Sequence, residues 1–179
     1  MKTTEILIAG FGGQGILFSG KFLAYKGLVE ELQVSWLPSY GPEMRGGTAN
    51  CNVILSETPV GSPIITAPDV LIAMNLPSLE KYAGSVVKGG QIYVDSSLIS
   101  AKVDRDDVDV FYIPATQMAK DAGIGSLANM IIVGHLLENN PELSFDGVCD
   151  VVEKLVPPKK AALKELNMKA LDLGKNYNK

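Results

Sequence analysis

The sequence predicts a three-layer α/β/α domain with a mixed, mainly parallel sheet and a helical C-terminal third. Short, continuous apolar runs at 5–9 and 70–74 are typical of strands buried on both faces. Segments with apolar residues at helical spacing separate such runs, and only helical patterns follow residue 126. No linker, repeat or low-complexity tract interrupts the chain, so we expect residues 1–179 to form a single domain.

Strands and helices are predicted to alternate in the first two thirds of the chain. The strand at 5–9 precedes a helix at 14–31 that is apolar nearly all round and is expected to lie between two layers. The stretch 48–56 alternates apolar and polar side chains, which predicts a half-exposed strand in antiparallel pairing. The remaining predictions are strands at 34–37, 70–74, 91–94 and 108–113 and a short helix at 78–83.

The last third is predicted to be helical. Ser126 and Ser144 are expected to cap two helices, the first running to residue 138. Two prolines at 157–158 begin a terminal helix, and Gly174 is its expected C-cap. One face of this helix is predicted to carry Leu163, Leu166, Ala170 and Leu173.

The composition argues against several classes of function. The net charge is −4, and no basic run marks a nucleic-acid-binding surface. No apolar stretch reaches the roughly 18 residues of a membrane span. The start MKTTEILIAG lacks the features of a signal peptide, and we expect a cytoplasmic protein. Cys51 and Cys149 have no C-x-x-C neighbour, which excludes a local iron–sulfur or metal motif and favours two buried free thiols.

A glycine-rich turn separates the first strand from the first helix. The run GFGGQG at 10–15 fits G-x-G-x-x-G in the strand–helix context that the dinucleotide-binding fingerprint requires. Glycines allow the backbone to turn tightly, and the free N–H groups of a helix N-terminus attract anions. The domain is therefore expected to be Rossmann-like. Its candidate cofactor-binding residues are Gly10, Gly12, Gly13, Gln14 and Gly15.

The fingerprint is incomplete at the second strand. A NAD site needs Asp or Glu at the end of that strand to bind the ribose hydroxyls, whereas this strand ends in Pro38 and Ser39. Glu30 and Glu31 precede the strand, and Arg45 is a weak match to an NADP site. The glycines are thus either a nucleotide site or positions of close packing or of an interface, and the second interpretation is favoured.

Reactive groups are scarce in this sequence. The single histidine, His135, lies in an apolar run and is expected to be a partly buried structural residue rather than a catalytic one. No nucleophile elbow, phosphate-loop lysine, metal-spaced cluster or thiamine diphosphate pattern occurs. We assign no catalytic residue and no metal ligand, and we interpret the acidic run at 104–109 as a solvated turn.

A second candidate segment lies at 38–47. Two prolines and three glycines exclude regular structure there. An ordinary surface turn is one interpretation, but such a turn seldom gathers Tyr, Met and a nearby Trp, which favours an interface or a site loop. The candidate interface or active-site wall consists of Tyr40, Glu43, Met44, Arg45, Gly46 and Gly47.

Several of these segments together resemble a known family. They are GGQG at 12–15, PSYGPEMRGG at 38–47, residues 48–53, Ser62-Pro63, and Asp69 before VLIAM. The chain resembles, over nearly its whole length, the gamma subunit of 2-oxoacid:ferredoxin oxidoreductases. The pairing of the two loop motifs is more specific than either motif alone. The second loop is more similar to the 2-oxoglutarate and branched-chain types than to the pyruvate type.

The resemblance implies a role within a larger enzyme. The whole enzyme of that family oxidatively decarboxylates a 2-oxoacid, joins the acyl group to coenzyme A and reduces ferredoxin. It implies thiamine diphosphate with magnesium between alpha- and beta-type subunits, and iron–sulfur clusters on cysteine-rich chains such as a ferredoxin-like delta subunit. By the same resemblance, this chain holds no cofactor alone, is inactive in isolation, and walls the active site or the approach of coenzyme A with its two candidate loops.

Two other classes of function stay open at this point. A stand-alone nucleotide-binding oxidoreductase would use Gly10, Gly12 and Gly15, but the missing ribose carboxylate argues against it. A non-catalytic interaction module related to the family would have the same sequence features as a true subunit.

Overall fold

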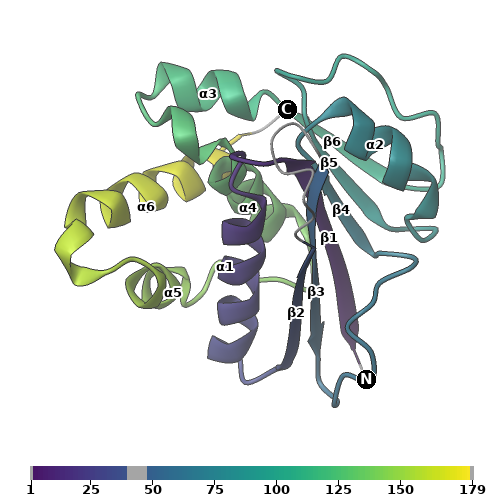
Figure 1. Cartoon of the computed structure of the whole chain (residues 1–179), viewed down its shortest axis with the longest axis horizontal. Helices are drawn as coiled ribbons and strands as arrows, with labels where there is room; N and C mark the ends of the chain where they lie inside the picture. The colour runs from purple at the N-terminus through teal and green to yellow at the C-terminus, as the bar shows by residue number, and fades with distance from the viewer. Residues whose placement is uncertain (1, 40–47, 178–179) are drawn as a thin grey trace.

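One six-stranded sheet lies between two helical layers (Figure 1). The computed structural model describes residues 2–39 and 48–177. The strands lie in the order β2-β3-β1-β4-β5-β6. Their bounds are β1 Thr3–Phe11, β2 Gln33–Ser39, β3 Thr48–Ser56, β4 Val70–Ala73, β5 Gln91–Asp95 and β6 Asp109–Ile113. β1, β4, β5 and β6 pair in parallel, whereas β3 is antiparallel to both β1 and β2. The predicted mixed, mainly parallel sheet is confirmed.

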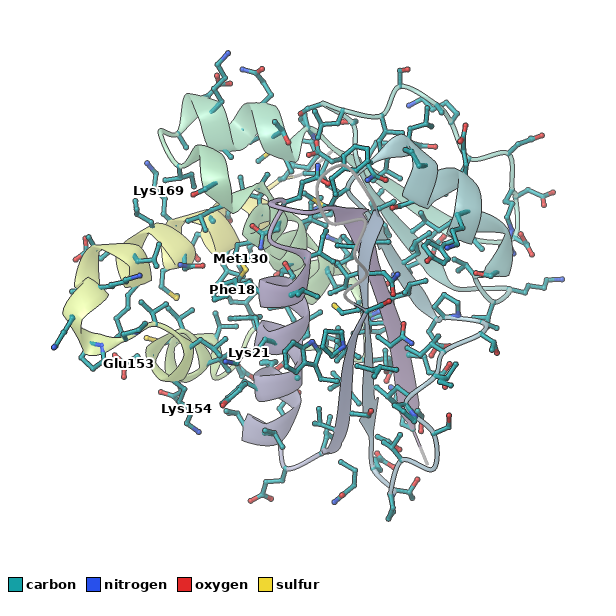
Figure 2. All side chains as sticks on the ribbon, viewed as in Figure 1. Phe18, Lys21, Met130, Glu153, Lys154 and Lys169 are labelled. Carbon is teal, nitrogen blue, oxygen red and sulfur yellow. The ribbon has the colours of Figure 1, made fainter. Side chains whose placement is uncertain are left out.

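The helices form two layers of unequal thickness. Their bounds are α1 Ile16–Val29, α2 Leu76–Tyr82, α3 Ala115–Asp121, α4 Ala128–Asn139, α5 Val148–Leu155 and α6 Ala161–Lys175. Helices α1, α4, α5 and α6 cover one face of the sheet, and α2 covers the other (Figure 1). Helix α1 packs on β3 and β2 on one side and on α4 and α5 on the other, as its apolar circumference predicts. Figure 2 shows Phe18 of α1 and Met130 of α4 within this thicker layer.

Helix α3 is absent from the sequence-based prediction. It is only seven residues long and follows Pro114 without a side-chain cap of its own. Asp95, at the buried end of β5, accepts hydrogen bonds from the backbone N–H of Thr116 at 3.3 Å and from its Oγ1 at 2.5 Å. A carboxylate at a helix N-terminus is stabilising. The start of α3 therefore depends on Asp95 of β5, and the sequence around α3 does not reveal this contact.

Both predicted serine caps are wrong. Ser126 lies in a short 3₁₀ turn, Gly125–Leu127, and α4 begins after it with no side-chain cap. Ser144 lies outside α5, which follows Gly147 in the left-handed region at φ 69°. The Ser144 hydroxyl instead donates to Glu30 of α1 at 3.0 Å. Neither serine therefore caps the helix predicted for it.

Gly174 is not the C-cap of α6 but lies in its last turn, and its position explains the packing of this helix. A Cβ at Gly174 would overlap the carbonyl oxygen of Ile131, and one at Gly134 would overlap that of Leu171. The two glycines therefore let the backbones of α4 and α6 approach closely. Of the predicted apolar face, Ala170 is buried and Leu163 and Leu173 pack against the core, whereas Leu166 is 37% exposed. The buried residues of α6 are Asn167, Ala170, Leu171 and Gly174.

The two thiols and the histidine have distinct environments. Cys51 is buried, and burial raises the pKa of its thiol to about 12. Cys149 is exposed, which corrects the expectation that both cysteines are buried. His135 is buried, its Nδ1 lies 3.1 Å from the carbonyl oxygen of Gly174, and burial lowers its pKa. The burial expected for His135 is confirmed, and its ring packs edge-on against Phe111 and Tyr177.

Within residues 2–39 and 48–177, no helix has the length and apolar character required to span a membrane.

Candidate functional site at the carboxyl edge of the sheet

The parallel strands β1, β4, β5 and β6 all end at one edge of the sheet. We call this the carboxyl edge; its described segments are 10–15, 74–78, 96–100 and 114–118. The chain leaves β1 for α1 on one face and leaves β4 for α2 on the other face (Figure 1). In open α/β sheets, ligands bind outside the carboxyl ends at such a switch point. The glycine-rich turn at 10–15 is therefore in the position where this fold most often forms a site.

The side chain of Gln14 braces the glycine-rich turn. Its Oε1 accepts a hydrogen bond from the backbone N–H of Phe11 at 2.6 Å. Its Nε2 donates to the carbonyl oxygen of Met74 at 2.9 Å. One amide thus joins the turn after β1 to the end of β4, and it uses both its donor and its acceptor to do so.

The glycines of the turn have two separate reasons to be glycine. Gly13 and Gly15 have φ values of 92° and 77°, a region that L side chains rarely adopt. A Cβ at Gly10 would lie 2.8 Å from the Cβ of Met74, and one at Gly15 would lie 2.5 Å from Nδ2 of Asn129. Backbone conformation and close packing therefore account for these glycines without a ligand.

Asn129, in the first turn of α4, is a site residue that the sequence-based prediction missed. Its Nδ2 donates to the carbonyl oxygen of Gly15 at 3.1 Å and to Oγ of Ser19 at 2.9 Å. The side chain is buried, and its Oδ1 has no hydrogen-bond partner among the described residues. The only hint in the sequence was an amide side chain at the start of a mostly apolar helix. The sequence pattern does not show that this amide bonds to Gly15, which lies 114 residues earlier.

The N-terminus of α1 presents backbone donors at this edge. Its N-cap is Gly15, which has no capping side chain, and its first turn contains no acidic residue. Free N–H groups and the helix dipole suit an anionic group. Gly12 and Gly13 are exposed, so the turn is an accessible surface. A groove of about 660 Å³ lies elsewhere, between α3 and α6.

The topology gives a second reason why the dinucleotide fingerprint is incomplete. Strand β3 lies between β1 and β2, so the end of β2 is two strands away from the glycine-rich turn. β2 also ends in Pro38 and Ser39 rather than in an acid. The end of β2 therefore supplies no carboxylate beside β1, whereas a NAD site requires one there to bind the ribose.

The second candidate segment, Tyr40 to Gly47, lies outside the described residues. Its flanking residues, however, are placed. Ser39 at the end of β2 pairs with Asn50, and Thr48 at the start of β3 pairs with Phe11 at the end of β1. The described chain on either side of the segment therefore lies at the carboxyl edge.

The brace formed by Gln14 leads to a first prediction. Gln14→Glu keeps the acceptor for the Phe11 N–H but replaces the donor with an oxygen that faces the Met74 carbonyl. We expect a loss of about 1–3 kcal/mol in the free energy of unfolding at pH 7, because a donor is lost and two acceptors are opposed. Urea denaturation measures this loss, and Gln33→Glu, at the exposed start of β2, is the control. Equal stability of the Gln14 variant and wild type would show that the two hydrogen bonds of Gln14 do not stabilise the turn.

Comparison with known proteins identifies the family. The family model described as pyruvate ferredoxin/flavodoxin oxidoreductase matches residues 5–177.

The chain belongs to this family.

Relatives and solved structures place it near the gamma subunits. It is 33% identical over 178 residues to "2-oxoglutarate synthase subunit KorC" of Methanothermobacter marburgensis, covering 96% of this chain and 94% of the relative. It is 40% identical over 136 residues to "Ketoisovalerate oxidoreductase subunit VorA" of the same organism, covering 76% of this chain but only 28% of that relative. The resemblance to gamma subunits of 2-oxoacid:ferredoxin oxidoreductases is confirmed.

Two solved structures share this fold. The keto/oxoacid ferredoxin oxidoreductase gamma subunit from Geobacter sulfurreducens PCA superposes with a TM-score of 0.84 at 30% identity, covering 97% of this chain and 95% of that chain. The 2-oxoglutarate:ferredoxin oxidoreductase from Magnetococcus marinus, with 2-oxoglutarate, coenzyme A and succinyl-CoA bound, superposes with a TM-score of 0.86 at 27% identity. That match covers 98% of this chain and 31% of the other, so the domain is part of a longer chain there.

Proposed function

We propose that the chain is the gamma subunit of a multi-subunit 2-oxoacid:ferredoxin oxidoreductase. The complex would oxidatively decarboxylate 2-oxoglutarate or a branched-chain 2-oxoacid, transfer the acyl group to coenzyme A and reduce ferredoxin. The similarity to subunit KorC of a 2-oxoglutarate synthase carries the proposal, since it extends over nearly the full length of both chains. The similarity to a ketoisovalerate oxidoreductase supports the branched-chain alternative.

The chemistry of the described residues supports a subunit that depends on partners. The thiol of Cys51 is buried with a raised pKa, and His135 is buried with a lowered pKa, so neither is placed as a reactive group. An iron–sulfur cluster of the usual type needs four cysteine thiolates, and the whole chain has two. The residues therefore do not fit a cluster, and the sequence contains no thiamine diphosphate pattern. We propose that alpha- and beta-type partners, with a ferredoxin-like chain, carry these cofactors.

The proposed contribution of this chain is to form part of the wall of the active site or of the approach of coenzyme A. The residues would be Gly10, Gly12, Gly13, Gln14 and Gly15 at the carboxyl edge. From the sequence alone, we extend the proposal to Tyr40, Glu43, Met44, Arg45, Gly46 and Gly47. Backbone N–H groups at the start of α1 suit a phosphate. None of the described carboxyl-edge segments contains a Lys or Arg, so a counter-charge would come from outside them. A single gamma-type domain over residues 1–179 stays a prediction.

The test of the proposed function is reconstitution. We expect no reduction of viologen by the purified chain with 2-oxoglutarate or ketoisovalerate, coenzyme A, magnesium and thiamine diphosphate. Adding the alpha- and beta-type chains should produce turnover that depends on this chain. Partners assembled without it are the control. Turnover by the chain alone would contradict the proposal that partner chains carry the cofactors. Full activity of the partners without it would favour a non-catalytic interaction module instead.

A further inference from the structure

Asn129 is a buried polar residue in an apolar environment. It lies in the first turn of α4, and the residues that follow it, 130–133, are apolar and buried. Asn129 itself is 3% exposed. Its Nδ2 has two acceptors, but its Oδ1 has no hydrogen-bond partner among residues 2–39 and 48–177. A buried polar atom without a partner costs free energy, so its presence in a native fold needs a specific explanation.

Stability alone does not explain this side chain. One of its two acceptors, the carbonyl oxygen of Gly15, already accepts the first helical hydrogen bond of α1, from the backbone N–H of Ser19 at 3.0 Å. The bond from Asn129 therefore does not rescue a carbonyl that would otherwise lack a partner. An apolar residue at this position would also remove the unpaired Oδ1. Residues that break a local rule without a clear gain in stability are expected at functional sites.

The contact with Gly15 restrains one peptide group at the start of α1. A peptide group is planar, so the C=O of Gly15 and the N–H of Ile16 belong to one rigid unit and point in opposite directions. Gly15 has a φ of 77° and no Cβ, so its own backbone restricts this unit little. Nδ2 of Asn129 holds the carbonyl end from α4 at 3.1 Å. The N–H of Ile16 is thereby directed toward the N-terminal end of α1.

A second amide restrains the same turn from another element. Gln14 joins the turn to the carbonyl oxygen of Met74 at the end of β4. Beside these two contacts, Gly12 and Gly13 are exposed, and the first turn of α1 contains no acidic residue. The free N–H groups of a helix start attract an anion. Donors that are held in place before the anion arrives bind it without the cost of reorganisation.

We infer that Asn129 is a positioning residue of the oxidoreductase. Through the carbonyl oxygen of Gly15, it holds the backbone N–H groups at the N-terminus of α1 in place for an anionic group of a reactant. The inference rests on the proposed function, because that reactant is one that the complex binds. Coenzyme A and the 2-oxoacid carry phosphate and carboxylate groups, respectively, and both suit such donors. Because Asn129 is buried, it acts through Gly15 and not by contact with the reactant.

The test compares two alanine variants in the reconstituted complex. Asn129→Ala removes both hydrogen bonds of the amide, whereas Ser19→Ala removes only the bond to Oγ of Ser19 and keeps the contact with Gly15. The KM values for coenzyme A and for the 2-oxoacid are measured separately. We expect Asn129→Ala to raise one of them at least about fivefold while kcat changes less than about twofold, because binding to the helix start is weakened. Ser19→Ala should change neither KM more than about twofold.

A third variant keeps the test decisive if Asn129→Ala does not fold or assemble, which urea unfolding and assembly with the partner chains measure. Asn129→Asp has nearly the same shape, and its carboxylate can accept a hydrogen bond from the hydroxyl of Ser19. It loses only the donor to Gly15. The same rise in KM is expected at high salt, where the added charge is screened.

The outcomes separate this inference from the proposed function. KM values that stay at wild-type levels, or a fall in kcat alone, would overturn the positioning role. Equal rises in KM for Asn129→Ala and Ser19→Ala would also overturn it, because the effect would then come from the packing of α1 on α4. Each of these results leaves the proposed function standing, since the wild-type chain still supports turnover. A wild-type chain that supports no turnover with the partner chains would overturn both.

Discussion

Replacing Gly174 by alanine is expected to lower the free energy of unfolding by about 3 kcal/mol, the upper end of the usual cost of overpacking. In an exposed helix the same change would stabilise the protein by up to about 1 kcal/mol, because alanine is the better helix former. Here an added Cβ would overlap the carbonyl oxygen of Ile131 and lie 2.8 Å from the backbone nitrogen of His135. Backbone atoms of a packed helix have little room to move, so α4 and α6 would have to separate.

Urea or thermal unfolding of the purified chain measures this effect. Gly134→Ala should cost a similar amount, since its Cβ would overlap the carbonyl oxygen of Leu171 on the facing helix. Gly84→Ala is the control because nothing lies within 4 Å of the position of its Cβ. A stabilised Gly174→Ala variant would show that the contact between α4 and α6 is not as close as described.

Glu30→Gln is expected to destabilise the protein by about 3 kcal/mol, as is typical when a buried ion pair loses one partner. The ammonium group of Lys26 is fully buried in the last turn of α1 and pairs with the carboxylate of Glu30, which is 27% exposed. The hydroxyl of Ser144 completes the cluster by donating to Glu30 at 3.0 Å and accepting from Lys26 at 3.4 Å. Glutamine removes the counter-charge and leaves the ammonium group buried.

A second substitution separates the charge effect from a loss of packing. In the double variant Lys26→Met and Glu30→Gln, the buried charge is also removed, and apolar replacements of buried ion pairs are often tolerated. We expect this double variant to be more stable than Glu30→Gln alone, and denaturant unfolding at pH 7 measures both. Lys26→Met alone completes the set. If the double variant loses as much stability as the two single variants together, the groups act independently and the ion pair is not the cause.

The sheet was largely predictable because its strands have strong local patterns. The strand predicted at 48–56 is observed over the same residues and in antiparallel pairing. The apolar runs at 5–9 and 70–74 correspond to the buried strands β1 and β4. Alternation or continuity of apolar residues reports directly on how many faces of a strand are covered. The order of the strands was not predictable, because nothing in the sequence of β3 shows that it lies between β1 and β2.

The helical third shows where local pattern stops being sufficient. Ser144 is a chemically reasonable cap, but its hydroxyl is used in the cluster with Glu30, 114 residues earlier. Gly174 is a reasonable C-cap, but a glycine is needed there because a side chain would prevent the close approach of α4. In both cases the residue takes part in a long-range contact instead of a local cap, and that contact has no signature in the neighbouring residues.

For the candidate site, the sequence alone determined the residue types and their local context, namely a glycine-rich turn between a strand and a helix, with Gln14 inside it. The tertiary structure decided which groups meet there. It brings Gln14 to the carbonyl oxygen of Met74, Asn129 to Gly15, and the ends of β1, β4 and β5 to one edge. The physical reason is that φ preferences and periodicity are properties of a few adjacent residues, whereas a shared edge is a property of strand order, which is set by packing over the whole sheet.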